Sequence, residues 1–199
     1  MTQSDIDGLS FALNEATVCG VEFDEERRIF ATTLVVLWLP EDGPEPKDLR
    51  LQFCFFPVGR LAVSLRGGFW NDEKAPTIPL VLADVDRLID NFGGNIYGHS
   101  FFDVHEEELA FWHGRMSLNW SSKQQDGHTH SFRLFQEASV QHLDLLVWFD
   151  ELRIFRSDFE EVSVPGVVDG SRRWWTAWQR DDPRTKGHGI IRLSDAGDG

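Results

Sequence analysis

The stretch Ala110-Phe-Trp-His-Gly-Arg-Met-Ser-Leu-Asn-Trp120 decides our expectation of the fold. Apolar and polar side chains alternate along it, which is typical of a strand with one buried face. A little further on, Gln125-Asp-Gly127 has the form of a three-residue hairpin loop that ends in a left-handed glycine. We therefore expect a β-hairpin over residues 110–138.

The register of this hairpin follows from centring the loop on Asp126. That pairing places Trp120 opposite Phe132 and Leu118 opposite Leu134, so that all four side chains share one apolar face. Two further turns are expected, one at Pro57-Val-Gly59 and one at Asp150-Glu151. The remaining strands are expected over residues 19–23, 29–39, 49–56, 61–65, 143–149, 153–155 and 159–164.

Two helices interrupt the strands. Residues 84–92 carry apolar side chains at helical spacing behind a capping Asp84, and Gly93-Gly94 follows them as a stop signal. Residues 170–180 are expected to form a C-terminal helix that ends before Pro183. The sequence thus predicts a mainly β fold (α+β if the helices are longer), either an antiparallel two-layer sandwich or an open barrel.

The length and composition fit one domain. The chain has 199 residues, 41% of them hydrophobic and 13% aromatic, which suffices for a packed core. We expect a single strand-rich domain over residues 10–193, with flexible tails at 1–9 and 194–199. The two cysteines lie in apolar runs, and the first residues lack the features of a signal peptide, so we expect a cytoplasmic protein.

The charge is strongly negative and uneven. The formal net charge is −14, which disfavours nucleic acid and anionic membranes as partners. Residues 1–170 hold 29 acidic and 13 basic side chains, whereas residues 171–199 hold 4 acidic and 6 basic ones. We expect the basic end to fold back on the acidic body, or otherwise to contact an acidic partner.

Two groups of residues suggest ligands. His128-Thr-His130 is an H-x-H pair that can place two imidazoles on one side of a strand, which makes both histidines candidate metal ligands. The second group is an aromatic cluster on the C-terminal helix. Two readings of this cluster stay open: an apolar face packed on the sheet, or a platform for a sugar, a peptide or a partner. Its candidate ligand-binding residues are Trp174, Trp175, Trp178 and Arg173.

Trp70 is a further candidate because it lies in a glycine-rich polar loop. A large aromatic residue in such a loop is either an anchor or part of a binding rim. The sequence holds no nucleophile elbow, nucleotide-binding glycine motif or H-E-x-x-H motif, and we expect no cofactor.

The leading functional hypothesis is a non-catalytic binding or protein-interaction module. Its expected partner is a basic protein or a second copy of the chain. The alternatives are a small-ligand or carbohydrate binder that uses exposed tryptophans, and a metal-dependent enzyme that uses histidines.

Overall fold

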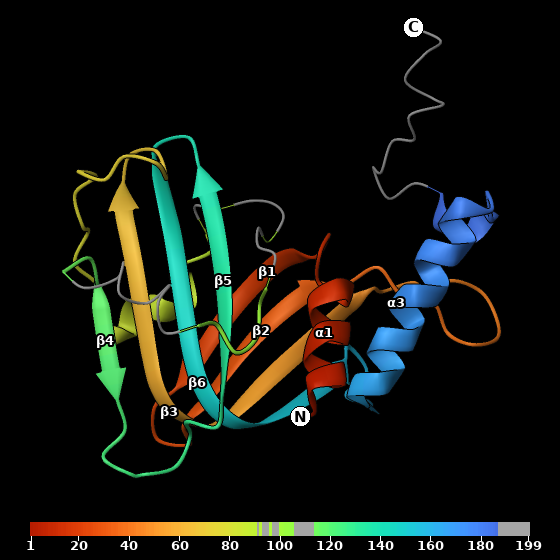
Figure 1. Cartoon of the computed structure of the whole chain (residues 1–199), viewed down its shortest axis with the longest axis horizontal. Coiled ribbons are helices and arrows are strands. Elements are labelled where there is room, and N and C mark those ends of the chain that lie inside the picture. The colour runs from red at the N-terminus through yellow and green to blue at the C-terminus, as the bar shows by residue number, and fades with distance from the viewer. Residues whose placement is uncertain (91, 93–95, 97–99, 106–113, 187–199) are drawn as a thin grey trace, which may run out of the picture.

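Two long strands form the centre of the sheet in the computed structural model, which describes residues 1–90, 92, 96, 100–105 and 114–186. The fold is mainly β, with one antiparallel curled sheet that has the form of a half-barrel (Figure 1). In chain order the elements are α1 (Gln3–Ala12), β1 (Thr17–Asp24), β2 (Ile29–Val35), β3 (Arg50–Gly67), the 3-10 helix η1 (Leu82–Arg87), β4 (Leu118–Ser121), β5 (His130–Ala138), β6 (Gln141–Arg156), β7 (Glu161–Val162), α3 (Val164–Gln179) and the 3-10 helix η2 (Pro183–Thr185).

The strand order is β1-β2-β3-β6-β5, with β4 beside β3 and β7 beside β6. Strands β3 and β6 are 18 and 16 residues long and pair along most of their length. Residues 50–55 of β3 pair with β2, whereas residues 60–63 pair with β4. The two ends of the central pair therefore acquire different neighbours, and the sheet curls between them (Figure 1).

The prediction of a turn at Pro57-Val-Gly59 is wrong, because strand β3 continues through these residues. The register with β6 shifts between Val58 and Arg60, as in a β-bulge. The backbone N–H of Val58 donates to Arg28 O (2.8 Å), and that of Gly59 donates to Gly127 O (3.1 Å). Loops distant in sequence thus satisfy the backbone groups that the bulge removes from the ladder.

The expected turn at Asp150-Glu151 is wrong for a similar reason. Strand β6 continues through both residues, and Glu151 pairs with Phe56 of β3. Acidic residues between apolar stretches indicate a turn locally, but here the long partner strand extends the pairing on both sides.

The expected hairpin also differs from the structure, although its strands exist. Strand β4 pairs with β3, so that Trp120 lies opposite Leu61. Strand β5 pairs with β6, so that Phe132 lies opposite Val147. The predicted pair of Trp120 and Phe132 is therefore wrong, and residues 110–113 lie outside the described residues. The alternation of apolar and polar residues identified both strands. It did not identify their partners, because β5 pairs with the apolar strand β6 and not with β4.

The N-terminal segment is helical, so the expectation of a flexible tail over residues 1–9 is wrong from residue 3 onwards. Thr2 and Asp5 form a capping box: Asp5 N donates to Thr2 Oγ1 (3.2 Å), and Thr2 N donates to Asp5 Oδ2 (2.8 Å). The carboxylate of Asp5 accepts hydrogen bonds from the backbone N–H and the hydroxyl of Thr2, and these two bonds lower its pKa. Ile6 and Leu9 of α1 are buried, which fixes the helix on the core.

The internal helix is shorter than expected and takes the 3-10 form over Leu82–Arg87. The apolar stripe predicted for it is nevertheless buried as expected, and consists of Val85, Leu88, Ile89 and Phe92.

The C-terminal helix is confirmed, but it begins earlier than expected, at Val164. Ser163 caps it, since its hydroxyl accepts a hydrogen bond from Gly166 N (3.2 Å).

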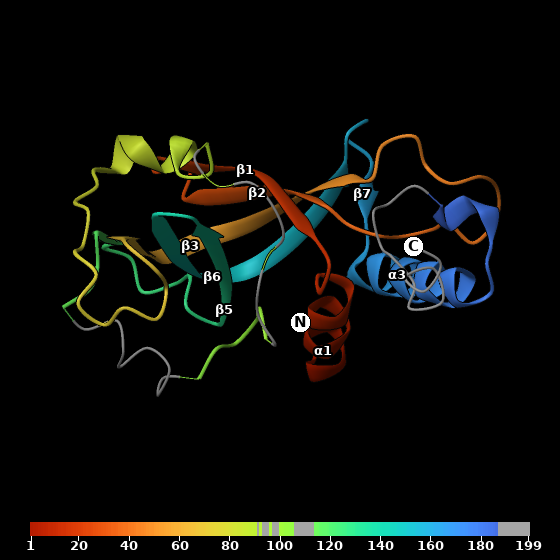
Figure 2. The same cartoon turned by 90° about the horizontal axis from the view of Figure 1, so that it is seen from above.

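One hydrophobic cluster joins the sheet, α1, η1 and the first turn of α3. Phe55 lies near its centre, with ring centroids 4.8 Å from those of Phe132 and Phe149. Figure 2 shows α1 and α3 on the same side of the sheet, with η1 at the other end of the molecule. Within the described residues, no helix combines the length and the apolar character that crossing a bilayer requires.

Candidate functional site

A cleft of about 670 Å³ lies between α1 and residues 100–105. Its lining is mostly polar and contains two carboxylates, amides, hydroxyls and one imidazole, together with three apolar side chains. The lining residues are Gln3, Ile6, Asp7, Ser10, Phe11, Asn14, Ser100, Phe102, Asp103 and His105.

Residues 100–105 form one wall because they run along the free edge of β5. Arg133 N donates to Phe101 O (2.7 Å), and Asp103 N donates to Ser131 O (2.9 Å). The Phe101 and Phe102 side chains are both buried and anchor this wall in the core. The wall is thus held by backbone pairing and by two aromatic anchors.

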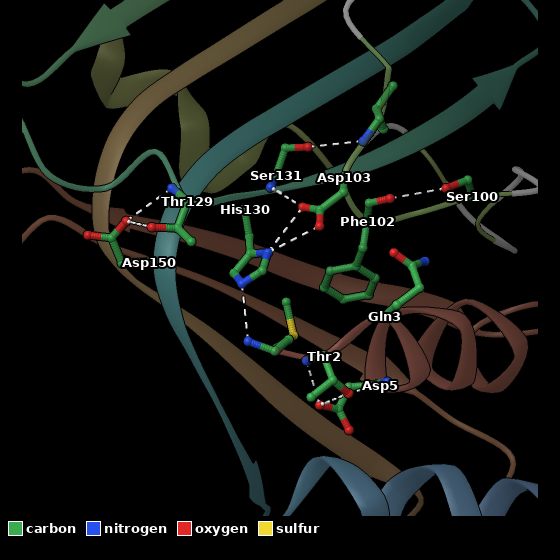
Figure 3. A network of polar contacts seen from close by, with 12 residues as sticks. Thr2, Gln3, Asp5, Ser100, Phe102, Asp103, Thr129, His130, Ser131 and Asp150 are labelled. Carbon is green, nitrogen blue, oxygen red and sulfur yellow. Dashed lines mark hydrogen bonds and ion pairs between the residues drawn. The ribbon is translucent and has the colours of Figure 1, made fainter.

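Asp103 connects the cleft to His130, as Figure 3 shows. Asp103 has a left-handed backbone conformation (φ 48°). One carboxylate oxygen accepts a hydrogen bond from Ser131 N (3.0 Å), and the other lies 3.1 Å from His130 Nδ1. His130 Nε2 lies 3.1 Å from the amino group of Met1, so both ring nitrogens have polar contacts.

The two candidate metal ligands have different surroundings. The His130 side chain is mostly buried beside Asp103, whereas His128 is exposed and its ring lies against Gly59. In the part of the chain that the structure describes, no three His, Cys, Asp or Glu side chains gather in a way that could hold a metal ion. The H-x-H pair therefore gains no third ligand there.

Asp150 fixes the loop that leads into His130. Its carboxylate accepts hydrogen bonds from the backbone N–H groups of Gly127 (2.8 Å), His128 (3.0 Å) and Thr129 (3.0 Å), and from the Thr129 hydroxyl (2.7 Å). These donors, above all the Thr129 hydroxyl, lower the pKa of Asp150 to about 2. The start of β5, and hence His130, is positioned by a charged residue of the neighbouring strand.

The α1 side of the cleft is acidic and aromatic. Asp7 accepts a hydrogen bond from Gln3 Nε2 (2.8 Å), and no Lys or Arg is among the described lining residues. The Phe11 side chain is 46% exposed, so its ring is available to a ligand. A carboxylate beside an exposed aromatic ring suits a cationic group.

The tryptophans of α3 lie mainly in the core. Trp174 is fully buried with Leu37 and Leu39, in a small cluster that packs α3 onto the segment after β2. Trp175 and Trp178 are partly buried against this cluster, and their ring centroids lie 5.6 Å apart. Trp174 therefore belongs to the apolar face that packs on the rest of the protein. Only parts of the Trp175 and Trp178 rings reach the surface.

Trp70 lies at an exposed apolar tip. The Phe69 and Trp70 side chains are 64% and 56% exposed, and Val140 of the β5–β6 turn is 72% exposed. Gly68 N donates to Val140 O (2.7 Å), which holds the two loops together. Trp70 is therefore not a buried anchor, and its role in a binding rim stays a prediction.

Arg173 lies apart from the cleft. Its Nε donates to Leu39 O (3.1 Å), and its side chain lines a second, smaller pocket beside α3.

Several residues of the cleft were missed by sequence reasoning. Asp7 and Phe11 belong to α1, which Thr2-x-x-Asp5 and the spacing of Ile6 and Leu9 could have indicated. No local sequence pattern indicates a role for Asp103. Its contacts are with Ser131 and His130 of strand β5, which is distant in sequence.

Comparisons with protein-family models, with curated proteins and with solved structures gave no match to this chain.

Proposed function

We propose that this protein is a non-catalytic interaction module that binds a positively charged segment of a partner protein. The observation that carries the proposal is the cleft beside α1, where Asp7 and the exposed Phe11 ring line the cleft with polar side chains and no Lys or Arg is among the described lining residues. A volume of about 670 Å³ is large enough for one or two arginine or lysine side chains.

The chemistry of the lining favours a cation over an anion or an apolar ligand. A guanidinium or ammonium group in the cleft would find the Asp7 carboxylate, the Asn14 amide oxygen and the Ser10 hydroxyl as acceptors. The ring of Phe11 would add a cation–π contact. The overall charge of −14 would steer such a segment towards the protein and speed its association.

The test is fluorescence anisotropy with a labelled decapeptide of alternating arginine and glycine. A peptide of alternating glutamine and glycine serves as the uncharged comparison. We expect saturable binding of the arginine peptide alone, with an affinity that falls as salt rises from about 0.05 to 0.5 M. Equal binding of both peptides, or none of either, would refute the proposal.

Variants locate the contact. Asp7→Asn keeps an acceptor for Gln3 but removes the charge, and we expect it to weaken binding about fivefold to tenfold. Glu73→Gln makes the same change in net charge on the exposed loop after Trp70, and should leave affinity nearly unchanged. If the two variants weaken binding equally, the interaction depends on net charge alone and the cleft is not the site.

The exposed tip offers a second contact surface, because Phe69, Trp70 and Val140 leave a large apolar area in solvent. Trp70→Ala belongs in the same titration. A loss of binding with Trp70→Ala, but not with Asp7→Asn, would move the site to the tip and support the small-ligand or aromatic-rim hypothesis.

A further inference from the structure

A second pocket, of about 450 Å³, lies between the C-terminal half of α3, residues 39–41 and the turn at residues 182–184. Part of its wall is apolar, formed by Leu39, Pro40 and Ala177. Its charged lining differs from that of the cleft beside α1, since four arginines contribute to it: Arg172, Arg173, Arg180 and Arg184.

Two of these arginines are paired with carboxylates. Arg184 forms a fork with Asp182, with Nη2–Oδ2 and Nε–Oδ1 distances of 2.7 and 3.1 Å. Accordingly, the pKa of Asp182 falls to about 2. Arg172 lies 3.5 Å from Asp169, and both side chains are more than half exposed. The charges of Asp182 and Asp169 are therefore balanced within the pocket.

The other two arginines are available to a ligand. Arg173 uses Nε to donate to Leu39 O (3.1 Å), which fixes its guanidinium on the pocket wall and leaves both terminal nitrogens without an ion pair among the described residues. Arg180 is exposed and has no side-chain hydrogen bond or ion pair to any residue that the structure describes. Glu41 lies at the rim and is open to solvent.

Among the described residues, two arginines without a carboxylate partner share this pocket, although the chain has 33 acidic and only 19 basic residues. Carboxylates to pair them are plentiful, yet the fold places both side chains beside an apolar wall. Residues 171–199, to which all four arginines belong, also carry a net excess of basic side chains in the sequence. Four of the six basic residues of this segment line the pocket, together with the carboxylates of Glu41, Asp169 and Asp182.

We propose that this pocket binds a small organic phosphate monoester. A carboxylate has two oxygens and is satisfied by one guanidinium fork, whereas a phosphate monoester has three and can accept from both Arg173 and Arg180. Arg173 lies within α3 and Arg180 is the C-cap residue that follows it, about 10 Å further along the axis, so their long side chains can converge on one anion. The apolar wall and the volume leave room for an organic group that inorganic phosphate lacks.

Isothermal titration calorimetry with phenyl phosphate, benzoate and inorganic phosphate tests this proposal on the full chain. We expect 1:1 binding of phenyl phosphate, with benzoate and inorganic phosphate each weaker by about tenfold or more. Quenching of tryptophan fluorescence by the ligand gives a second readout, because Trp178 lies in the last turn of α3, two residues before Arg180. Equal affinity for all three anions, or the absence of saturation, would indicate general anion association and overturn the proposal.

Variants give the decisive comparison. Arg180→Gln changes an exposed residue and should raise the Kd for phenyl phosphate about tenfold without moving the urea midpoint. Arg173→Lys keeps the charge but not the fork, and should also weaken binding. Arg87→Gln, at an exposed arginine of η1, makes the matched change in net charge and should have no effect. If Arg87→Gln weakens binding as much as Arg180→Gln, the pocket is not the site.

Discussion

Replacing Asp150 with asparagine removes the charge from a carboxylate that holds three consecutive backbone N–H groups and one hydroxyl. Asparagine has a similar shape but only one acceptor oxygen, which is uncharged. Gly127 N–H, which donates to Oδ2, would meet the amide NH2 group, and the three donors on Oδ1 would keep only a weaker, uncharged acceptor. We expect the loop before β5 to loosen and the free energy of unfolding to fall. His130, at the end of this loop, should become less well positioned.

The magnitude follows from the pKa of Asp150, which lies at about 2 instead of 3.8. A difference of this size corresponds to about 2.5 kcal/mol at full strength. The site is partly exposed, and solvent screening reduces the expected loss to about 1–2 kcal/mol. Urea unfolding at pH 7, followed by tryptophan fluorescence, measures it. Glu151→Gln, an exposed neighbour on the same strand, is the matched control and should cost less than about 0.5 kcal/mol.

The pH dependence provides an independent check. Because the folded state lowers the pKa of Asp150, its stabilising effect is complete above about pH 5 and is lost as the pH falls through about 2. The difference in stability between the wild type and Asp150→Asn should therefore be constant from pH 5 to 8 and shrink below about pH 4. A difference that stays constant down to pH 2.5, or is no larger than that of Glu151→Gln at pH 7, would refute this reasoning.

Two further substitutions test the packing. Gly8→Ala should lower the stability by about 1–3 kcal/mol despite the better helix propensity of alanine, because a Cβ at Gly8 would lie 2.7 Å from Val168 Cγ1. In thermal denaturation, adding Val168→Ala should restore part of the loss, and no restoration would contradict the close contact. Trp174→Ala should cost about 3–5 kcal/mol because the ring is fully buried. Trp175→Ala should cost clearly less in the same urea experiment, and equal losses would contradict the placement of the two rings.

Patterns within single segments were enough to predict the kind of fold. Alternation identified most strands, and the apolar stripe of residues 85–92 is buried as expected. Such patterns indicate which side of a segment is apolar. That side is buried in the fold regardless of which strand the segment pairs with. The mainly β architecture and the C-terminal helix could therefore be predicted.

Strand pairing could not be predicted in the same way. Pro57 and Gly59 normally indicate a turn, yet backbone groups of Arg28 and Gly127 stabilise a bulge there instead. Whether such a segment turns or continues depends on residues elsewhere in the chain, which no local pattern contains. The same applies to β4 and β5, whose partners are the long strands rather than each other.

The candidate site was the least predictable part. The cleft exists only because α1 packs beside residues 100–105, and its wall depends on pairing with β5. Residue types singled out from the sequence, such as Trp174, proved to be core residues. Arg173 was singled out as a candidate ligand-binding residue of the aromatic cluster, but its position on a pocket wall follows from its hydrogen bond to Leu39 O.

The pairing of β3 with β6 has a consequence for how the chain folds. Leu51 lies opposite Arg156 and Gly67 opposite Gln141, so the longest ladder joins segments that are far apart in sequence. Closing so large a loop costs chain entropy before any of its contacts form, which slows folding in proteins of this kind. During synthesis, β3 emerges from the ribosome well before β6, its main pairing partner. Until β6 has emerged, the apolar face of β3 stays exposed and can aggregate.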